Sequence, residues 1–252
     1  MRKKDTTQNG DSGLQRRTYE TSYVQSLFDS IAQRYDFLTH VLSFGIDTLW
    51  RKRAIRLLAP YRPKHILDVA TGTADLAIEA SKLHPEAITG IDVSQRMMDV
   101  GIKKIMRRNL SDIMTIQSEN AEAMTFASDS FDAVTVSFGV RNFSNLQKGL
   151  SEFHRVLRNG GVAMILEFSH PQIFPIKQLY RFYSTIIMPP LGEAILHDRS
   201  ASDYLPSTIS EFPSGETFCA LLRSVGFTQV KYFPLTFGIA TIYFAEKHSC
   251  LC

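Results

Sequence analysis

The sequence predicts an α/β fold built on a mostly parallel sheet with helices on both faces. Between residues 65 and 168, short apolar runs alternate with segments of helical periodicity, a pattern typical of repeated β-α units. The chain has 252 residues, of which 44% are hydrophobic and 21% charged, so it can bury a sizeable core. Two apolar runs near its end, 229–235 and 239–245, predict a closing pair of antiparallel strands.

Two helices are predicted before this alternation. Apolar residues such as Phe28, Ile31 and Tyr35 recur at helical spacing within the segment 23–58. The Ser-Phe-Gly sequence at 43–45 interrupts that segment, and prolines follow it. These N-terminal helices, over 21–60, are expected to cap the sheet domain.

The remaining elements follow in order along the chain. We expect strands at 65–70, 87–92, 113–117, 133–138 and 162–168, and helices at 75–83, 95–107, 146–157 and 215–224. A single domain is expected over 21–248, between a disordered polar tail at 1–20 and a short tail at 249–252.

The segment 171–213 interrupts the β-α rhythm and is interpreted as an insertion that forms a lid near the site. Its first part is rich in aromatic and aliphatic residues, including Tyr180 and Tyr183. Such residues suit a large apolar substrate. Ordinary core or helix packing is the alternative, and periodicity alone favours it.

Composition excludes several classes of protein. The net charge of +3 is too small for a dedicated nucleic-acid binder, and the basic run Arg51–Arg53 is typical of a solvated helix face. Three cysteines, two of them in the last three residues, do not form a disulfide framework, so we expect a reducing cytoplasm. No stretch is apolar enough to predict a membrane span, and no residue cluster has metal-ligand spacing. The oligomeric state is left open, a homodimer included.

The strongest local motif is the segment 66–75, Ile-Leu-Asp-Val-Ala-Thr-Gly-Thr-Ala-Asp. An apolar strand runs into a turn of small residues around Gly72, and a helix follows, so backbone can approach a ligand closely. Twenty residues beyond Gly72, Asp92 ends the second strand, where a carboxylate can accept hydrogen bonds from ribose hydroxyls. Asp68 and Asp75 flank the turn and would repel the phosphates of a dinucleotide, whereas the cationic S-adenosylmethionine suits them. The alternative is an α/β domain that binds no nucleotide.

Two later strand ends support a cofactor site. Asn120 and Ala121 follow the third strand, where an amide or a backbone N–H can read an adenine edge. Ser137 ends the fourth strand. Because ligands of open α/β sheets bind beyond the carboxyl ends of the strands, these residues are expected to face one crevice.

The chain resembles the family of methyltransferases that C-methylate demethylmenaquinol and polyprenyl-methoxy-benzoquinol, over about residues 28–247. The segments that carry the resemblance are Phe28–Asp36, Leu42–Ile46 with Leu49–Trp50, Leu67–Leu76, Phe138–Asn142, Arg155–Gly161 and Leu166–Ser169. The resemblance implies a Rossmann-like class I methyltransferase fold: seven strands, the last one antiparallel. It also implies that S-adenosylmethionine is held by Thr73, Asp92, Asn120, Ala121 and Ser137.

One departure from the family pattern concerns the turn itself. Family members often carry glycine where this chain has Thr71 and Ala74. We therefore expect both residues to adopt negative φ.

The resemblance implies a polyprenyl quinol as the substrate, most closely demethylmenaquinol. The amino-acid sequences of the segments 68–75 and Glu211–Pro213 resemble those of the menaquinone-type members. The benzoquinol step of ubiquinone biosynthesis and methylation of another phenolic or lipid acceptor are the alternative enzyme functions. A non-catalytic α/β interaction protein and a nucleic-acid methyltransferase are the other classes weighed.

Arg141 and Asn142 are the candidate catalytic residues, because they follow the fourth strand beside the expected methyl position. A quinol ring carbon becomes nucleophilic as its neighbouring hydroxyl loses a proton, and Arg141 would stabilise that phenolate or hold a water. Asn142 would orient the quinol oxygen. The alternative for Arg141 is a structural ion pair with an acid such as Asp132. The candidate proton acceptors are Tyr35, His170 and His197, of which histidine fits best by pKa.

A polyprenyl tail stays in the bilayer, so we expect peripheral contact with the inner face of the cytoplasmic membrane. The helix expected at 48–58 places Trp50 beside four basic residues that suit anionic headgroups. A solvated helix face is the alternative for this segment.

Overall fold

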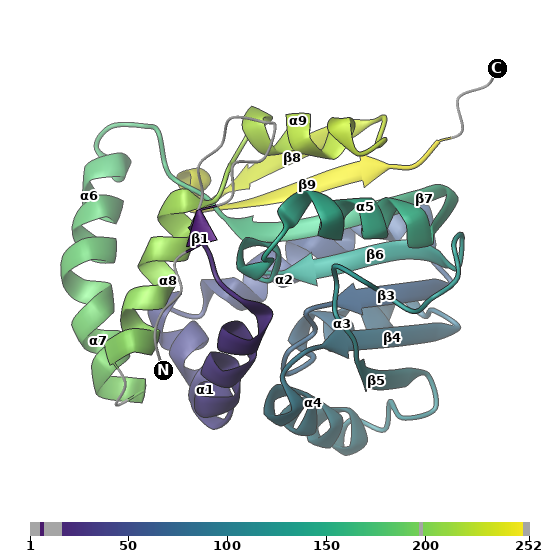
Figure 1. Cartoon of the computed structure of the whole chain (residues 1–252), viewed down its shortest axis with the longest axis horizontal. Helices are drawn as coiled ribbons and strands as arrows, with labels where there is room; N and C mark the ends of the chain where they lie inside the picture. The colour runs from purple at the N-terminus through teal and green to yellow at the C-terminus, as the bar shows by residue number, and fades with distance from the viewer. Residues whose placement is uncertain (1–5, 8–16, 197–198, 249–252) are drawn as a thin grey trace.

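A seven-stranded sheet forms the centre of the computed structural model, which describes residues 6–7, 17–196 and 199–248 (Figure 1). The strand order is β5-β4-β3-β6-β7-β9-β8, and only β9 runs antiparallel to its neighbours in this sheet. The strands are β3 (His65–Val69), β4 (Ala87–Asp92), β5 (Met114–Ser118), β6 (Phe131–Ser137), β7 (Leu157–Phe168), β8 (Val230–Leu235) and β9 (Ala240–Glu246). The predicted fold class, with its antiparallel last strand, is confirmed.

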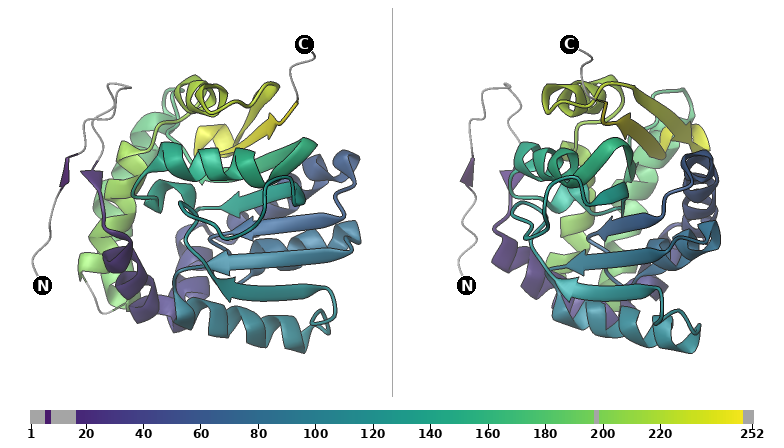
Figure 2. Two further views of the ribbon diagram at one scale, coloured as in Figure 1. Left: turned by 45° about the vertical axis from the view of Figure 1, so that its right-hand side comes forward. Right: turned by 90° about the vertical axis from the view of Figure 1, so that its right-hand side faces the viewer.

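Helices lie on both faces of this sheet (Figure 2). They are α2 (Ile46–Leu58), α3 (Asp75–Ala80), α4 (Gln95–Arg107), α5 (Leu146–Val156) and α9 (Glu216–Ser224), with 3₁₀ turns η1 (Ala59–Tyr61), η2 (Ser81–Leu83), η3 (Val140–Asn142) and η5 (Thr236–Gly238). Near the N-terminus, the backbone of β1 (Thr6–Thr7) pairs antiparallel with β2 (Arg17–Thr18).

Successive residues of the central strands pack in two separate hydrophobic clusters. In β3, Ile66 packs in the cluster that contains α2 and α3, and Leu67 packs in the cluster that contains α5 and α9. This alternation arises because successive side chains of a strand point to opposite faces. Phe153 of α5 is fully buried in the second of these clusters, and such burial contributes about 1.5–3 kcal/mol.

A second group of helices lies beyond the carboxyl ends of the parallel strands (Figure 1). Its members are α1 (Thr21–Leu42), α6 (Ile176–Phe182), the π-helical turn η4 (Tyr183–Ile187), α7 (Met188–Leu196) and α8 (Arg199–Glu211). A third cluster, with Leu27 and Leu38 from α1, Leu196 from α7 and Tyr204 from α8, joins these helices. The segment predicted as an insertion is therefore a helical layer packed on the N-terminal helix.

Most expected element boundaries hold within two residues. The exceptions include β7, which begins at Leu157 rather than at residue 162. Gly160 and Gly161 precede the expected strand, but their backbone groups form hydrogen bonds with Lys247 beyond β9 and so extend the ladder. The helix expected at 75–83 ends at Ala80 and continues as the 3₁₀ turn η2. Among the described residues, no helix is both long and apolar enough to cross a membrane.

Candidate functional site

Two adjoining cavities open beyond the carboxyl ends of the strands. The first, here named the acidic cavity, is lined by Asp92, Glu119 and Glu122. The second, here named the apolar cavity, has a volume of about 340 Å³ and is lined mainly by aromatic and aliphatic side chains. Phe28 and Tyr35 of α1, together with Phe138, line both cavities and form the wall between them.

The acidic cavity gathers most of the residues predicted to bind the cofactor. The predicted residues that line it are Gly72, Asp92, Asn120, Ala121 and Ser137. The lining residues, all of them in the described part of the chain, include three carboxylates and no lysine, arginine or histidine. Such a lining favours a cationic ligand and disfavours a phosphate.

Asp92 is fixed by backbone donors at the end of β4. Its Oδ2 accepts a hydrogen bond from the amide of Gly72 at 2.8 Å, and its Oδ1 accepts one from the amide of Ser94 at 2.8 Å. Burial raises the pKa of the Asp92 carboxyl, and the backbone bonds oppose that shift. The carboxylate is thus held at the mouth of the turn between β3 and α3.

Thr73, also predicted to bind the cofactor, does not line the acidic cavity. Its hydroxyl donates to Asp36 Oδ1 at 2.6 Å and lies 3.0 Å from Lys104 Nζ. The side chain therefore ties the turn to α1 and α4. This arrangement was not visible in the motif, because Asp36 lies 37 residues earlier in the chain.

The expectation of negative φ at both turn positions is wrong for Ala74, whose φ is +67°. Thr71 does not share this conformation. Ala74 occupies the N-cap position of α3, and its amide donates to the carbonyl of Thr71 at 2.8 Å. Alanine tolerates the left-handed region at a cost of roughly 1–2 kcal/mol, because its side chain is only a methyl group.

Asp68 is a buried carboxyl at the base of the same turn. It accepts hydrogen bonds from the hydroxyls of Thr135 at 2.6 Å and Thr71 at 2.7 Å. Burial raises its pKa to about 6, and the two hydroxyls oppose the shift. Asp68 does not line either cavity, so its contacts assign it to the support of the turn and of β6.

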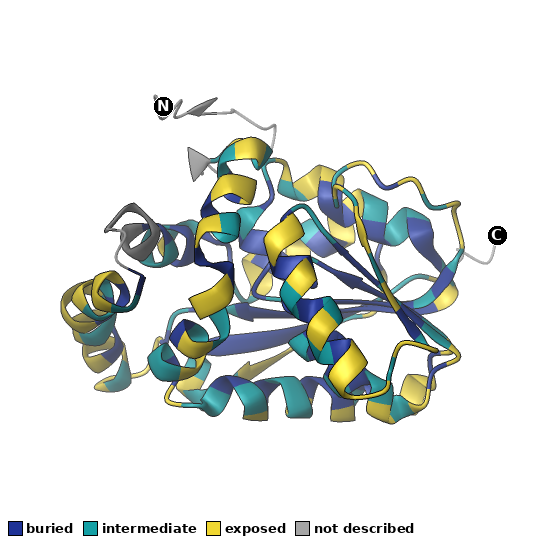
Figure 3. Ribbon diagram, turned by 90° about the horizontal axis from the view of Figure 1, so that it is seen from below, coloured by how far each residue is buried: buried dark blue, intermediate teal, exposed yellow. Residues whose placement is uncertain are grey.

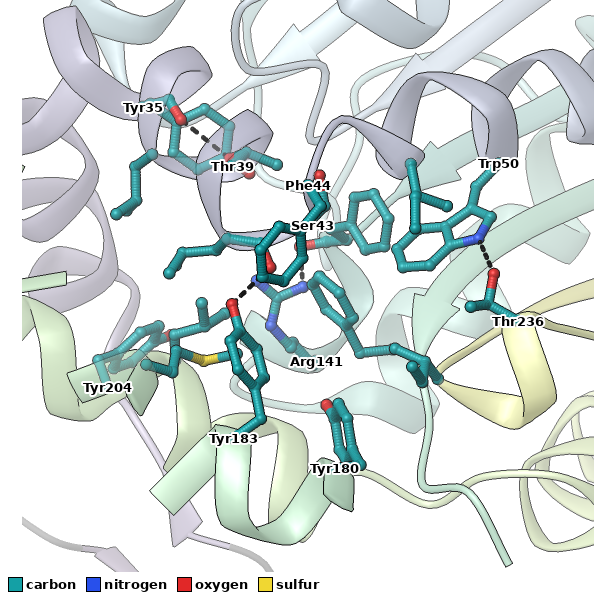
Figure 4. Close-up of a pocket in the computed structure, with 18 of the residues that line it drawn as sticks. Tyr35, Thr39, Ser43, Phe44, Trp50, Arg141, Tyr180, Tyr183, Tyr204 and Thr236 are labelled. Carbon is teal, nitrogen blue, oxygen red and sulfur yellow. Dashed lines mark hydrogen bonds between the residues drawn. The ribbon is translucent and has the colours of Figure 1, made fainter. Parts of the chain in front are cut away.

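The apolar cavity has one charged lining residue within the described part of the chain, Arg141 (Figure 4). Arg141 is 3% exposed, and its Nη1 lies 2.8 Å from Oε1 of Glu167 and donates to the carbonyl of Phe138. The guanidinium also lies 5.4 Å from the ring centroid of Phe168. The ion pair weighed as the alternative for Arg141 is therefore present, but its acid is Glu167; Asp132, the example named, pairs with Arg158 at 2.7 Å.

Asn142 lies on the acidic side of the wall between the cavities. Its Oδ1 accepts a hydrogen bond from the hydroxyl of Tyr204 at 2.9 Å, and Tyr204 lines the apolar cavity. The two predicted catalytic residues therefore face different cavities, on successive positions of η3. A group transferred between the cavities would pass close to both.

The tyrosines predicted for the substrate site, including the candidate proton acceptor Tyr35, all lie at the apolar cavity. Burial raises the pKa of Tyr35, so its hydroxyl keeps its proton at neutral pH. Burial likewise raises the pKa of Tyr180 to about 12 and that of Tyr183, whose hydroxyl donates to the carbonyl of Leu42. All three tyrosines line the apolar cavity.

His170 is not part of this group. His170 does not line the apolar cavity; its Nε2 lies 3.1 Å from the carbonyl of Ile209. His197 lies outside the described residues.

Trp50 does not face solvent, in contrast to the expected membrane helix. It is 5% exposed, contacts the rings of Phe138 and Phe168, and donates from Nε1 to Thr236 Oγ1 at 2.8 Å. Its neighbour Arg51 is ion-paired with Asp47 and Asp75. The aromatic and one of the basic residues of this helix are thus engaged within the protein.

Several site residues escaped the sequence analysis. Glu167 and Tyr204 hold the predicted catalytic pair, and Asp29 and Asp36 hold α1 over the acidic cavity. A buried acid inside an apolar strand was the one available signal, since Glu167 stands in the run Met-Ile-Leu-Glu-Phe.

The sheet order, with its antiparallel β9, and the helices around the sheet define the fold as the Rossmann-like class I methyltransferase fold. A solved structure from Thermotoga maritima, described as a SAM-dependent methyltransferase and possible histamine N-methyltransferase, has the same fold with a TM-score of 0.61 at 17% identity, covering 88% of this chain and 99% of that one. The chain belongs to the ubiE/COQ5 methyltransferase family, whose model matches residues 16–247.

Two relatives illustrate the membership. Demethylmenaquinone methyltransferase of Bacteroides fragilis is 48% identical over 229 residues, which is 90% of this chain and 94% of the relative. The ubiquinone/menaquinone biosynthesis C-methyltransferase UbiE of Geotalea uraniireducens is 44% identical over 226 residues, 89% of this chain and 96% of the relative.

Proposed function

We propose that the protein C-methylates a polyprenylated quinol with S-adenosylmethionine as the methyl donor, and that demethylmenaquinol is its substrate. The observation that carries this proposal is a large apolar cavity beside the acidic cavity; among the described residues that line the apolar cavity, Arg141 is the charged one. The name of the Bacteroides relative supports demethylmenaquinol. The name of the Geotalea relative keeps the benzoquinol step of ubiquinone biosynthesis as the second candidate.

The residues of the acidic cavity fit S-adenosylmethionine. Its sulfonium and ammonium groups are cations, and three carboxylates line the cavity. In this proposal Asp92 accepts hydrogen bonds from ribose hydroxyls, and Asn120 with Ala121 contacts the adenine; that all three line the acidic cavity supports these roles. When bound, S-adenosylmethionine supplies an electrophilic methyl group.

The residues of the apolar cavity bind and activate the acceptor. The aromatic lining holds the quinol ring, and Arg141 stabilises the oxygen of a ring hydroxyl as it loses its proton. A permanently charged guanidinium is a poor base, so the proton leaves to water beside Arg141. Asn142 and Tyr204 orient the ring near the wall between the cavities.

Transfer of a labelled methyl group tests this proposal directly. The purified protein is incubated with methyl-labelled S-adenosylmethionine and with a short-chain demethylnaphthoquinol or the corresponding benzoquinol, and the lipid product is identified by mass spectrometry. We expect label on the naphthoquinol ring carbon. Label on the benzoquinol alone would favour the second candidate, and label on neither would reject quinol methylation.

Calorimetry tests the cofactor site separately. Removing an acceptor of charge-assisted bonds costs about 1.5–3 kcal/mol, so Asp92→Ala should bind S-adenosylmethionine roughly ten- to a hundredfold more weakly. Thr73→Ala is the matched comparison and should have the smaller effect, because its hydroxyl bonds Asp36 rather than facing the cavity. Unchanged affinity of Asp92→Ala would remove this residue from the site.

A long prenyl tail partitions into the bilayer, so the proposed reaction requires the enzyme to meet its substrate there. We therefore propose that the protein works as a peripheral membrane protein at the cytoplasmic surface.

A further inference from the structure

Six large apolar side chains face solvent around the mouth of the apolar cavity. All six are 55–78% exposed, and three of them also line the cavity. Two of the six lie on α6, one lies on η4 and one lies in the turn before α6; this segment stands at one end of the molecule, away from the sheet, and its residues are largely exposed (Figures 1 and 3). We name this group the mouth surface, and its members are Phe44, Phe174, Leu179, Phe182, Ile186 and Phe237.

Packing does not account for the two aromatic residues on the opposite rim. Phe44 and Phe237 are 78% and 66% exposed, and both adopt positive φ, at 52° and 58°. Bulky residues rarely occupy this region, and such strain is typical of functional positions. Phe44 contacts Tyr183 of η4 with ring centroids 5.8 Å apart, so it is held against the turn that carries Ile186 of the mouth surface.

The charged residues of α6 and η4 are both positive. Lys177 and Arg181 are exposed on α6, one turn apart. From Phe168 to Gly192 the sequence contains no aspartate or glutamate. Apolar residues together with cations are the composition that binds anionic bilayers, where each basic residue adds electrostatic attraction.

We propose that the mouth surface docks on an anionic lipid bilayer, so that the apolar cavity opens into the membrane interior. This inference rests on the proposed function, because a prenyl tail longer than the cavity must leave through the mouth. A tail that passed through water would expose its methylenes at a high free-energy cost, and docking removes that exposure. The contact is thus made by α6, η4 and the three phenylalanines Phe44, Phe174 and Phe237 outside these helices, whereas Trp50 and α2 are not its centre.

Vesicle sedimentation tests the docking surface. The double variant F182E/I186E replaces two members that do not line the cavity. We expect its partition onto vesicles of phosphatidylcholine and phosphatidylglycerol to fall at least ~30-fold below that of the intact chain. The matched control Met106→Glu changes a side chain that is 62% exposed in α4, and it should bind as the intact chain does. K177A/R181A should weaken binding roughly tenfold on anionic vesicles and leave binding to pure phosphatidylcholine unchanged.

Two substrates separate this inference from the proposed function. F182E/I186E should methylate a short-chain, water-soluble quinol at the normal rate and a long-chain quinol in vesicles at least about tenfold more slowly. Equal vesicle binding by F182E/I186E and the intact chain would overturn the docking surface, as would an equal loss in Met106→Glu. A dimer of the intact chain that dissociates in F182E/I186E would assign the surface to a second copy. Failure of the intact chain on the short-chain quinol would instead reject the proposed function.

Discussion

At the scale of single residues, the pair formed by Arg141 and Glu167 is central to the candidate chemistry. Both side chains are at most 3% exposed, so each charge depends on the other for compensation. Glu167 accepts bonds from the side chain of Arg141 and from the backbone amide of Phe168. Glu167 is therefore a positioning residue, which fixes the direction in which the guanidinium meets the cavity.

Arg141→Lys and Arg141→Ala should separate chemistry from cofactor binding. Lysine keeps the positive charge but lacks the planar guanidinium with its paired N–H donors, and alanine lacks both the charge and the donors. We expect both variants to bind S-adenosylmethionine normally and to lose at least ~100-fold in turnover, a loss of about 2.7 kcal/mol. Arg158→Ala, which removes an arginine from a half-exposed pair, is the control and should keep its turnover.

Folding must be controlled in this experiment, because alanine leaves Glu167 buried without its partner. The double variant R141M/E167Q removes both charges and should fold, as replacement of a buried pair often does. Full turnover in a folded Arg141→Ala or R141M/E167Q protein would contradict the assignment.

At the scale of elements, the turn that leaves β6 is packed against the turn that leaves β3. A Cβ atom at Gly139 would lie 2.6 Å from the Cβ of Ala70 and 3.0 Å from Val136 Cγ2. Ala70 itself has a φ of 50°, so its backbone has little freedom to move away. This contact explains why glycine stands between Phe138 and Val140.

Gly139→Ala should therefore lower the free energy of unfolding by about 1–3 kcal/mol through overpacking. The double variant A70G/G139A removes the opposing methyl group and places glycine at a position of positive φ, so it should recover most of the loss. Denaturant unfolding measures both effects. Equal destabilisation of the single and double variants would show that Ala70 is not the obstacle.

The elements themselves were predictable from sequence to a large extent, but their partners were not. Period-two and helical patterns identified the strands of the sheet and the break between α1 and α2. They did not resolve α6, η4, α7 and α8 within the insertion. They also gave no sign that Arg141 would meet Glu167, 26 residues away, or that Asp29 would meet Ser94, 65 residues away. Local periodicity reports which face of an element is buried, whereas such pairs depend on the crossing of distant elements.

At the scale of the whole molecule, α1 is a cover tied to the sheet domain by two acids two turns apart. Asp29 Oδ1 accepts bonds from Ser94 Oγ at 2.6 Å and from the amide of Arg96. Asp36 Oδ2 lies 2.6 Å from Lys104 Nζ, and its Oδ1 accepts the Thr73 hydroxyl. Because α1 lines the acidic cavity, these contacts hold α1 in place as one wall of that cavity.

The variant D29N/D36N should loosen this cover without unfolding the sheet. We expect faster amide hydrogen exchange in α1, unchanged exchange in β3 and β6, and a roughly tenfold faster release of S-adenosylmethionine. Asp99→Asn, at an exposed position of α4, is the control. Protection of α1 equal to that of the intact chain would show that apolar packing alone holds the helix.

The wall made by Phe28, Tyr35 and Phe138 belongs to both cavities, so each ligand alters the surface that the other one meets. Thermodynamic linkage then makes the effect reciprocal. If bound methyl donor changes the affinity for the quinol by some factor, bound quinol changes the affinity for the methyl donor by the same factor. Methyl transfer would turn the sulfonium into a neutral thioether while the ammonium keeps its charge, so the attraction of the acidic lining for the spent cofactor would weaken. Product departure on one side of the wall is thereby coupled to departure on the other.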